Sequence, residues 1–212
     1  MESENDKTWD FDPWAERYDA VVANDTRHYY AKYDNVLDAV VEFADLGSGK
    51  CVLDIGTGTG SLAIRCLGRG AYVVGLDPSA SMLAVAREKI GPHSNVEFVQ
   101  CPEPFLRTPY PDASFDAVVS TYAYHHIPHR LKAESVCEML RVLKTGGRWV
   151  VGDLAFENEA AEIRALRELG WLEEEYFTRI DDLSQIFAEF DIALQAHQFT
   201  PVTWVLTATK NV

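Results

Sequence analysis

The sequence predicts an α/β fold, with one parallel sheet that carries helices on both faces. Three observations predict it. Short apolar runs typical of buried strands alternate with segments of helical spacing through the middle of the chain. The first run, Cys51–Ile55, breaks into a loop with glycines at alternate positions, and helix-like sequence follows at Ser61–Gly68. Two strand-like runs near the end, 192–199 and 202–209, are joined by a tight turn and predict an antiparallel hairpin on the sheet edge.

The remaining elements follow from the same patterns. Parallel strands are expected at 51–55, 72–77, 96–100, 115–120 and 148–153. Helices are expected at 61–68, 79–89, about 131–143, 157–169 and 182–190. The third of these helices should stop at Gly146 and Gly147, and residues 101–114 should form a proline-rich loop. Before the first strand, one helix should begin at Pro13 with Asp12 as its cap, and a second should cover 29–44.

Composition narrows the class of protein. A chain of 212 residues predicts one domain, and 33 acids against 19 bases give a net charge of −14. An acidic surface repels phosphate backbones and anionic lipids, so we expect neither nucleic acid nor membrane as a partner. The four cysteines contain no C-x-x-C pair, which favours reduced thiols. With a polar, acidic N-terminus and no long apolar run, these features predict a cytoplasmic protein. Both a monomer and a homodimer remain open.

The glycine loop and a later acid together predict a nucleoside ligand. Gly56, Gly58 and Gly60 let the backbone adopt positive φ and let a ligand lie against bare N–H groups. Asp77 closes the next predicted strand, roughly 20 residues past the loop, where an acid can hydrogen-bond a ribose diol. The ends of parallel neighbouring strands meet at one sheet edge, so loop and acid can hold an adenosine-bearing cofactor together.

The stretches LDIGTGTG, GLDPS and FDAVVSTYAYHHI, in this order, resemble the class I S-adenosylmethionine (SAM) methyltransferases, and most closely the YrrT-like group of predicted small-molecule methyltransferases. The resemblance implies a Rossmann-like, doubly wound, seven-stranded sheet of order 3-2-1-4-5-7-6, with strand 7 antiparallel. It implies a single domain, 1–212. In it, N-terminal helices (1–46) lie over the cofactor site, and a core sheet (47–212) carries a late helical insertion at about 155–190.

The same resemblance assigns cofactor roles. SAM would donate the methyl group and leave as S-adenosylhomocysteine (SAH). Asp54 would anchor the methionine amino group, directly or through water, or else brace the loop by a hydrogen bond. Asp77 would hold the ribose hydroxyls or serve as a charge at a helix N-terminus. The expected cofactor-binding residues are Asp54, Gly56, Thr57, Gly58, Gly60, Asp77, Pro78, Met82, Glu103, Ser120 and Thr121.

Glu103 is in this set because the sequence departs from the family pattern. After the third strand the family often has Gly-Asp, whose acid accepts the adenine amino group, whereas this chain has Cys101-Pro102. Proline offers no side-chain acceptor and no N–H. Glu103 or a backbone carbonyl is the expected substitute, and the adenine contact is the open part of the cofactor site.

The acceptor side follows the fourth strand, where ligands of such sheets bind. A general base would serve an oxygen or thiol acceptor, and histidine suits neutral pH. The catalytic candidates are His125 and His126, then Tyr124 and Tyr18, although either histidine could instead pack in the core. His126 and His129 have helical spacing, but no nearby carboxylate or cysteine completes a metal site, so none is expected.

Aromatic residues of the N-terminal segment and of the late insertion could complete the site. Among the former, packing on the sheet is favoured for Trp14, whereas Tyr18 and Tyr30 could either pack or line the pocket. In the insertion, we expect a substrate lid from Tyr176, Phe177 and Arg179, on position alone.

Three functions are compatible with these features. A methyltransferase acting on a small-molecule acceptor is the leading interpretation. A module that binds SAM without chemistry is the second. An NAD-dependent oxidoreductase is the third, but its fingerprint is G-x-G-x-x-G/A, whereas this loop places Ser61 at the last position.

Overall fold

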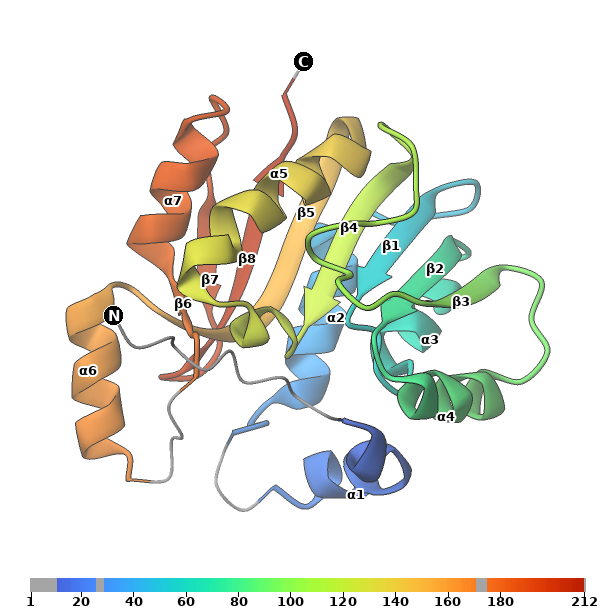
Figure 1. Cartoon of the computed structure of the whole chain (residues 1–212), viewed down its shortest axis with the longest axis horizontal. Coiled ribbons are helices and arrows are strands. Elements are labelled where there is room, and N and C mark those ends of the chain that lie inside the picture. Colours follow the sequence, from blue (N-terminus) through green and yellow to red (C-terminus); the bar gives the residue numbers. More distant parts are fainter. Residues whose placement is uncertain (1–10, 26–28, 171–174, 212) are drawn as a thin grey trace.

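The computed structural model describes residues 11–25, 29–170 and 175–211. Figure 1 shows a central twisted sheet with helices on both faces, which confirms the predicted class. Its strands lie in the order β3-β2-β1-β4-β5-β8-β7, and a short β6 pairs beside the end of β5. The strands are β1 (Cys51–Ile55), β2 (Tyr72–Asp77), β3 (Val96–Gln100), β4 (Phe115–Thr121), β5 (Leu143–Phe156), β6 (Thr178–Arg179), β7 (Gln195–Gln198) and β8 (Thr203–Thr209).

The topology agrees with the expected order once the two-residue β6 is set aside. Strands β1 to β5 pair in parallel, and β8 is antiparallel to both β5 and β7. The sequence did not reveal β6 because two residues carry no periodic pattern. It lies parallel to β5, with Ala155 opposite Thr178.

Two apolar layers cover the sheet because neighbouring strand residues point to opposite faces. Val52, Ala117 and Val150 pack under α2 (Tyr33–Phe43) and α3 (Ser61–Gly68). Leu53 and Trp149 face the opposite side, which α5 (Lys132–Val142) and α7 (Ile180–Ala188) cover. Two more helices, α4 (Ala80–Ile90) and α6 (Glu159–Glu168), complete the long helices of the described chain.

The structure differs from the sequence prediction in three bounds. Helix α5 ends at Val142, one residue before its expected end, but Gly146 and Gly147 do not stop it. Leu143 is already extended and pairs with Phe115, so β5 begins there rather than at the expected residue 148. The helix expected at 29–44 begins only at Tyr33, because Lys32 adopts a left-handed conformation with φ of 61°.

The first predicted helix is also divided. It consists of a 3-10 turn, η1 (Asp12–Arg17), and a short α1 (Tyr18–Ala23). Asp12 does not cap its own helix. Its carboxylate accepts hydrogen bonds from the Ser79 hydroxyl and, at 3.2 Å, from the Ser81 N–H, at the start of α4. The acid that the sequence assigned to a local cap therefore fastens the N-terminal segment to the sheet domain.

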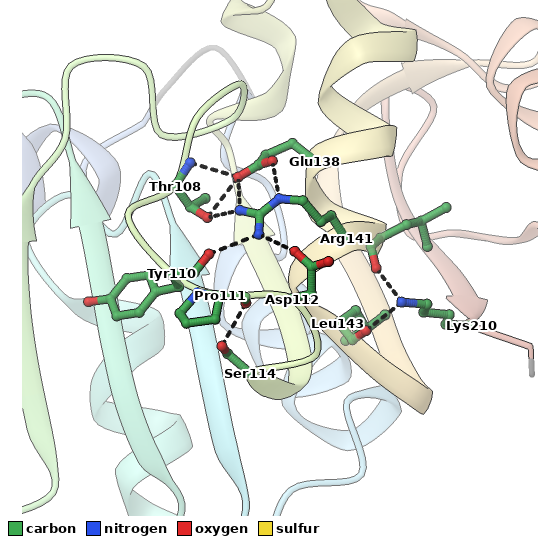
Figure 2. Close-up of polar contacts among 10 residues, drawn as sticks. Thr108, Tyr110, Pro111, Asp112, Ser114, Glu138, Arg141, Leu143 and Lys210 are labelled. Carbon is green, nitrogen blue, oxygen red and sulfur yellow. Dashed lines mark hydrogen bonds and ion pairs between the residues drawn. The ribbon is translucent and has the colours of Figure 1, made fainter.

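The proline-rich loop 101–114 is held by side chains of α5 (Figure 2). The Arg141 guanidinium donates to the Tyr110 carbonyl at 2.9 Å and to Asp112 at 2.8 Å. Glu138 accepts from the Thr108 N–H at 2.7 Å and pairs with Arg141. These contacts fix an irregular segment whose backbone has no ladder partners.

Candidate functional site

The glycine loop after β1 has the backbone that the sequence predicted. Gly56, Gly58 and Gly60 have φ of 70°, 54° and 80°, a region that residues with a Cβ avoid. A Cβ on Gly56 would lie 2.5 Å from the Cβ of Ala123, so the loop after β4 packs directly against it. A Cβ on Gly60 would approach Ala86 of α4 to 3.1 Å. Gly56 and Gly58 line a cavity, whereas Gly60 serves the packing of α3 on α4.

Asp77 links the loop to the end of β2. Its Oδ2 accepts the Gly58 N–H at 2.9 Å and its Oδ1 accepts the Ser79 N–H at 2.9 Å. Burial raises the pKa of Asp77, and the two N–H groups oppose that rise. The carboxylate lines the cavity and retains acceptor capacity for a ligand hydroxyl, since each oxygen can accept two hydrogen bonds.

Asp54 lies just beneath the loop, outside the cavity lining. Its Oδ2 accepts the Thr57 hydroxyl at 2.6 Å, which is the bracing role that the sequence left open. Its Oδ1 is buried without a hydrogen-bond partner among the described residues. Burial raises the pKa of Asp54 to about 7. The contact with a methionine amino group stays a prediction.

A cavity of about 320 Å³ opens at the carboxyl edge of β1, β2 and β4. Figure 1 shows α1 beyond this edge, on the side to which β4 points. The cavity collects most of the predicted site residues on one surface. These are Tyr18, Gly56, Thr57, Gly58, Asp77, Met82, Thr121, His125 and His126.

The N-terminal segment forms the outer wall of the cavity. Asp19 accepts from the Thr59 hydroxyl at 2.6 Å and forms an ion pair with Lys89 of α4. Trp14 lines the cavity and is 45% exposed, so it is not the packing residue that the sequence favoured. Tyr18 also lines the cavity, and burial raises its pKa well above 10, so its hydroxyl stays protonated at neutral pH.

His125 and Asp153 form a buried pair at the inner wall. The His125 ring Nδ1 lies 2.5 Å from Asp153 Oδ1, and the His125 backbone N–H donates to Oδ2 at 3.1 Å. Burial alone would raise the pKa of Asp153, but His125 and the Leu154 N–H hold it below its ordinary value. An ionised carboxylate only accepts, so Nδ1 carries the proton and Nε2 is the acceptor. Nε2 lies 3.5 Å from the Tyr29 hydroxyl.

His126 differs from its neighbour. Burial and the adjacent His125 lower its pKa to about 4, so it is neutral at pH 7. Its Nδ1 lies 3.8 Å from the Glu175 carboxylate, and its ring packs 5.0 Å from the ring of Phe11. His126 therefore shapes the cavity wall, while His125 has the better geometry for a base.

Several predicted residues do not line the cavity. Tyr124 is fully buried between Phe105 and Trp149, on the core side of its turn, which removes it from the catalytic candidates. Ser120 is also fully buried, one residue before Thr121 and on the opposite face of β4. Pro78 and Glu103 are exposed on loops outside the lining, so an adenine contact by Glu103 has no support.

The three residues predicted to form a substrate lid in the late insertion do not line the cavity. Tyr176 packs on His129, Phe177 is buried against Phe156, and Arg179 pairs with Glu162, all outside the cavity lining. The residue beside them, Glu175, does line the cavity.

The sequence analysis did not identify Asp153 as the partner of His125. Asp153 is the last residue of the strand predicted at 148–153, just as Asp77 is the last residue of the strand predicted at 72–77. An acid at the end of a predicted strand was therefore the signal that could have identified Asp153.

Comparisons with known proteins agree with this geometry. Residues 52–147 match the family described as "Methyltransferase domain". An uncharacterized methyltransferase of Geobacillus thermodenitrificans is 35% identical over 213 residues, covering 95% of both chains. The magnesium protoporphyrin IX methyltransferase of Synechocystis PCC 6803, solved with bound SAH, superposes with a TM-score of 0.76 at 17% identity, covering 95% of this chain and 96% of that one. The structure of the DhpI–SAH complex superposes with a TM-score of 0.70 at 22% identity, covering 95% of this chain and 93% of that one.

A Rossmann-like sheet, a glycine loop and an acid placed to bind a ribose, all at one cavity, are typical of enzymes that bind a nucleotide cofactor. The chain belongs to the class I SAM-dependent methyltransferase family. Within the described residues, every helix is too short or too polar to cross a membrane.

Proposed function

We propose that the protein transfers the methyl group of SAM to a small-molecule acceptor, with His125 as general base. The observation that carries this proposal is that His125, which Asp153 holds from behind, lines the same cavity as Gly58 and Asp77. The glycine loop and a base oriented by a carboxylate therefore border one cavity.

The residues present fit the cofactor. Gly56 and Gly58 present bare backbone to the cavity, and Asp77 offers a buried carboxylate for the ribose hydroxyls. Met82 and Thr121 line the same cavity. When bound, SAM supplies an activated methyl group on a positively charged sulfur. The protein's own task is to hold the acceptor in line and exclude water.

The base is prepared by its partner. Asp153 fixes the His125 tautomer and ring orientation, because the Nδ1 proton is held in a 2.5 Å contact. Nε2 is then the atom that accepts the proton of an acceptor O–H, S–H or N–H. The imidazolium that forms is stabilised by the buried carboxylate, as in hydrolase triads.

A small acceptor fits the dimensions of the site. The cavity holds about 320 Å³, and the N-terminal segment covers it through Asp12, bonded to Ser79 and Ser81, and Asp19, bonded to Thr59. A cavity of this size, covered in part by the N-terminal segment, favours a compact ligand over a polymer or a protein surface.

Multiple-turnover formation of SAH from SAM tests the proposal, with panels of small thiols, phenols, amines and carboxylates as acceptors. We expect turnover with at least one class, and His125→Gln should lower kcat about 100-fold or more while SAM affinity is retained. SAM binding without turnover on any panel would favour the binding module. Unchanged kcat in His125→Gln would remove His125 as the base.

A further inference from the structure

Glu175 brings a carboxyl group to the cavity beside His126. Its side chain is 6% exposed and lines the cavity beside His126. Among the described residues, its Oε2 accepts no hydrogen bond. The 3.8 Å to His126 Nδ1 exceeds hydrogen-bond distance. Because a buried carboxylate oxygen that accepts no hydrogen bond is costly, its presence at a ligand cavity calls for a ligand group that donates to it.

The described lining of the cavity offers Glu175 no positively charged side chain. His126 is neutral at pH 7, since burial lowers its pKa to about 4. None of the described residues that line the cavity is a lysine or an arginine. Asp25 and Asp77 add further carboxylates to the same lining. The cavity therefore favours a cationic ligand and disfavours an anionic one.

Aromatic rings complete the environment. Tyr29 and Tyr30 line the cavity with their ring centroids 5.2 Å apart, and Phe11 also lines it, with its ring 5.0 Å from the ring of His126. A carboxylate among aromatic faces is the arrangement that binds ammonium groups, because the ring faces attract cations. Phosphate or carboxylate ligands would need the basic side chains that this lining lacks.

We propose that the methyl acceptor carries a protonated amino group and that Glu175 binds it. This inference rests on the proposed function, because it places the amino group on the molecule whose reacting atom meets His125. Glu175 then selects amine-bearing acceptors, and His125 acts on the nucleophile.

Thermal unfolding of the ligand-free protein gives a first test that needs no known acceptor. Glu175→Gln should raise Tm by about 2–4 °C, because an uncharged amide replaces a carboxyl group whose buried Oε2 accepts no hydrogen bond among the described residues. Glu162→Gln is the matched control. Glu162 is 5% exposed, and its Oε2 accepts a hydrogen bond from Arg179 Nε at 2.7 Å. Removing this paired carboxylate should lower Tm. A fall in Tm for Glu175→Gln would show that its carboxylate already has a partner and would overturn the proposal.

Calorimetry on the SAH-loaded protein gives the second test. The probes are tyramine, 4-ethylphenol and 4-hydroxyphenylacetate, which share a phenol ring and carry cationic, neutral and anionic arms. Tyramine should bind about tenfold or more tightly than 4-ethylphenol, and the anionic probe weakest. In Glu175→Gln, tyramine and 4-ethylphenol should bind with about equal affinity. Failure of tyramine to bind more tightly than 4-ethylphenol, or a preference that survives in the variant, would overturn the proposal.

SAH affinity separates this inference from the proposed function. Glu175→Gln should bind SAH as the unsubstituted protein does. A loss of SAH affinity equal to the loss of tyramine affinity would assign Glu175 to the cofactor and contradict its acceptor role. Methyl transfer to neutral acceptors alone would leave the proposed function standing and remove the amine preference.

Discussion

Gly56→Ala should destabilise the protein far more than Gly58→Ala, although both change a glycine of one loop. At both positions φ is positive, 70° and 54°, which costs a residue with a Cβ about 1–2 kcal/mol. At Gly56 the new Cβ would also lie 2.5 Å from the Ala123 Cβ, and overpacking of this kind adds about 1–3 kcal/mol. At Gly58 the nearest atom is 4.0 Å away. The free energy of unfolding should therefore fall by about 2–5 kcal/mol in Gly56→Ala and by about 1–2 kcal/mol in Gly58→Ala.

Urea unfolding of the ligand-free variants measures both losses, provided that the m-value is unchanged. A double variant, Gly56→Ala with Ala123→Gly, should recover about 1–3 kcal/mol relative to Gly56→Ala, because it removes the atom that clashes. Equal losses at Gly56 and Gly58, or no recovery in the double variant, would refute the close packing of the glycine loop on the loop that carries His125.

Three further predictions concern the carboxylates. Asp77→Asn should weaken SAH binding in calorimetry about tenfold or more, because the amide accepts less strongly from ribose hydroxyls, and unchanged affinity would place the ribose elsewhere. Asp153→Asn should lower kcat about 100-fold or more with little change in SAM affinity, through loss of the His125 tautomer, and equal falls in both would indicate a structural role instead. Asp54 has a raised pKa of about 7, so it should make the ligand-free protein less stable as pH rises from about 4 to about 7, by up to about 1.4 kcal/mol per pH unit. In Asp54→Asn that decline should flatten in urea unfolding series, and an unchanged pH profile would contradict the burial of the charge.

The sheet could be predicted because its signals are local. Apolar runs fixed five parallel strands, and the run that ends at Asp77 gave both a strand and the position of its acid. The start of α2 and the start of β5 could not be predicted in the same way. Lys32 has no sequence feature that announces a left-handed conformation, and Leu143 leaves the helix to pair with Phe115, which is a tertiary contact.

Site residues could be predicted where they belong to a sequence motif, but not where their role depends on the direction of the side chain. The glycine motif identified Gly56 and Gly58 as cavity residues, whereas the run Tyr124-His125-His126 does not reveal which side chains face the cavity. The turn places Tyr124 in the core and His125 on Asp153. Glu175 comes from the late insertion, where the sequence indicated Tyr176, Phe177 and Arg179 instead. Only the fold brings it beside His126.

We propose that one cavity holds the cofactor between the glycine loop and Asp77 and presents the acceptor to His125. A crystal structure of the protein soaked with SAH would show whether it does. We expect the ribose hydroxyls on the Asp77 carboxylate, the methionine portion along Gly56 and Gly58, and the sulfur on the side of Thr121 and His125. SAH bound away from Asp77, or with its sulfur turned away from His125, would contradict it.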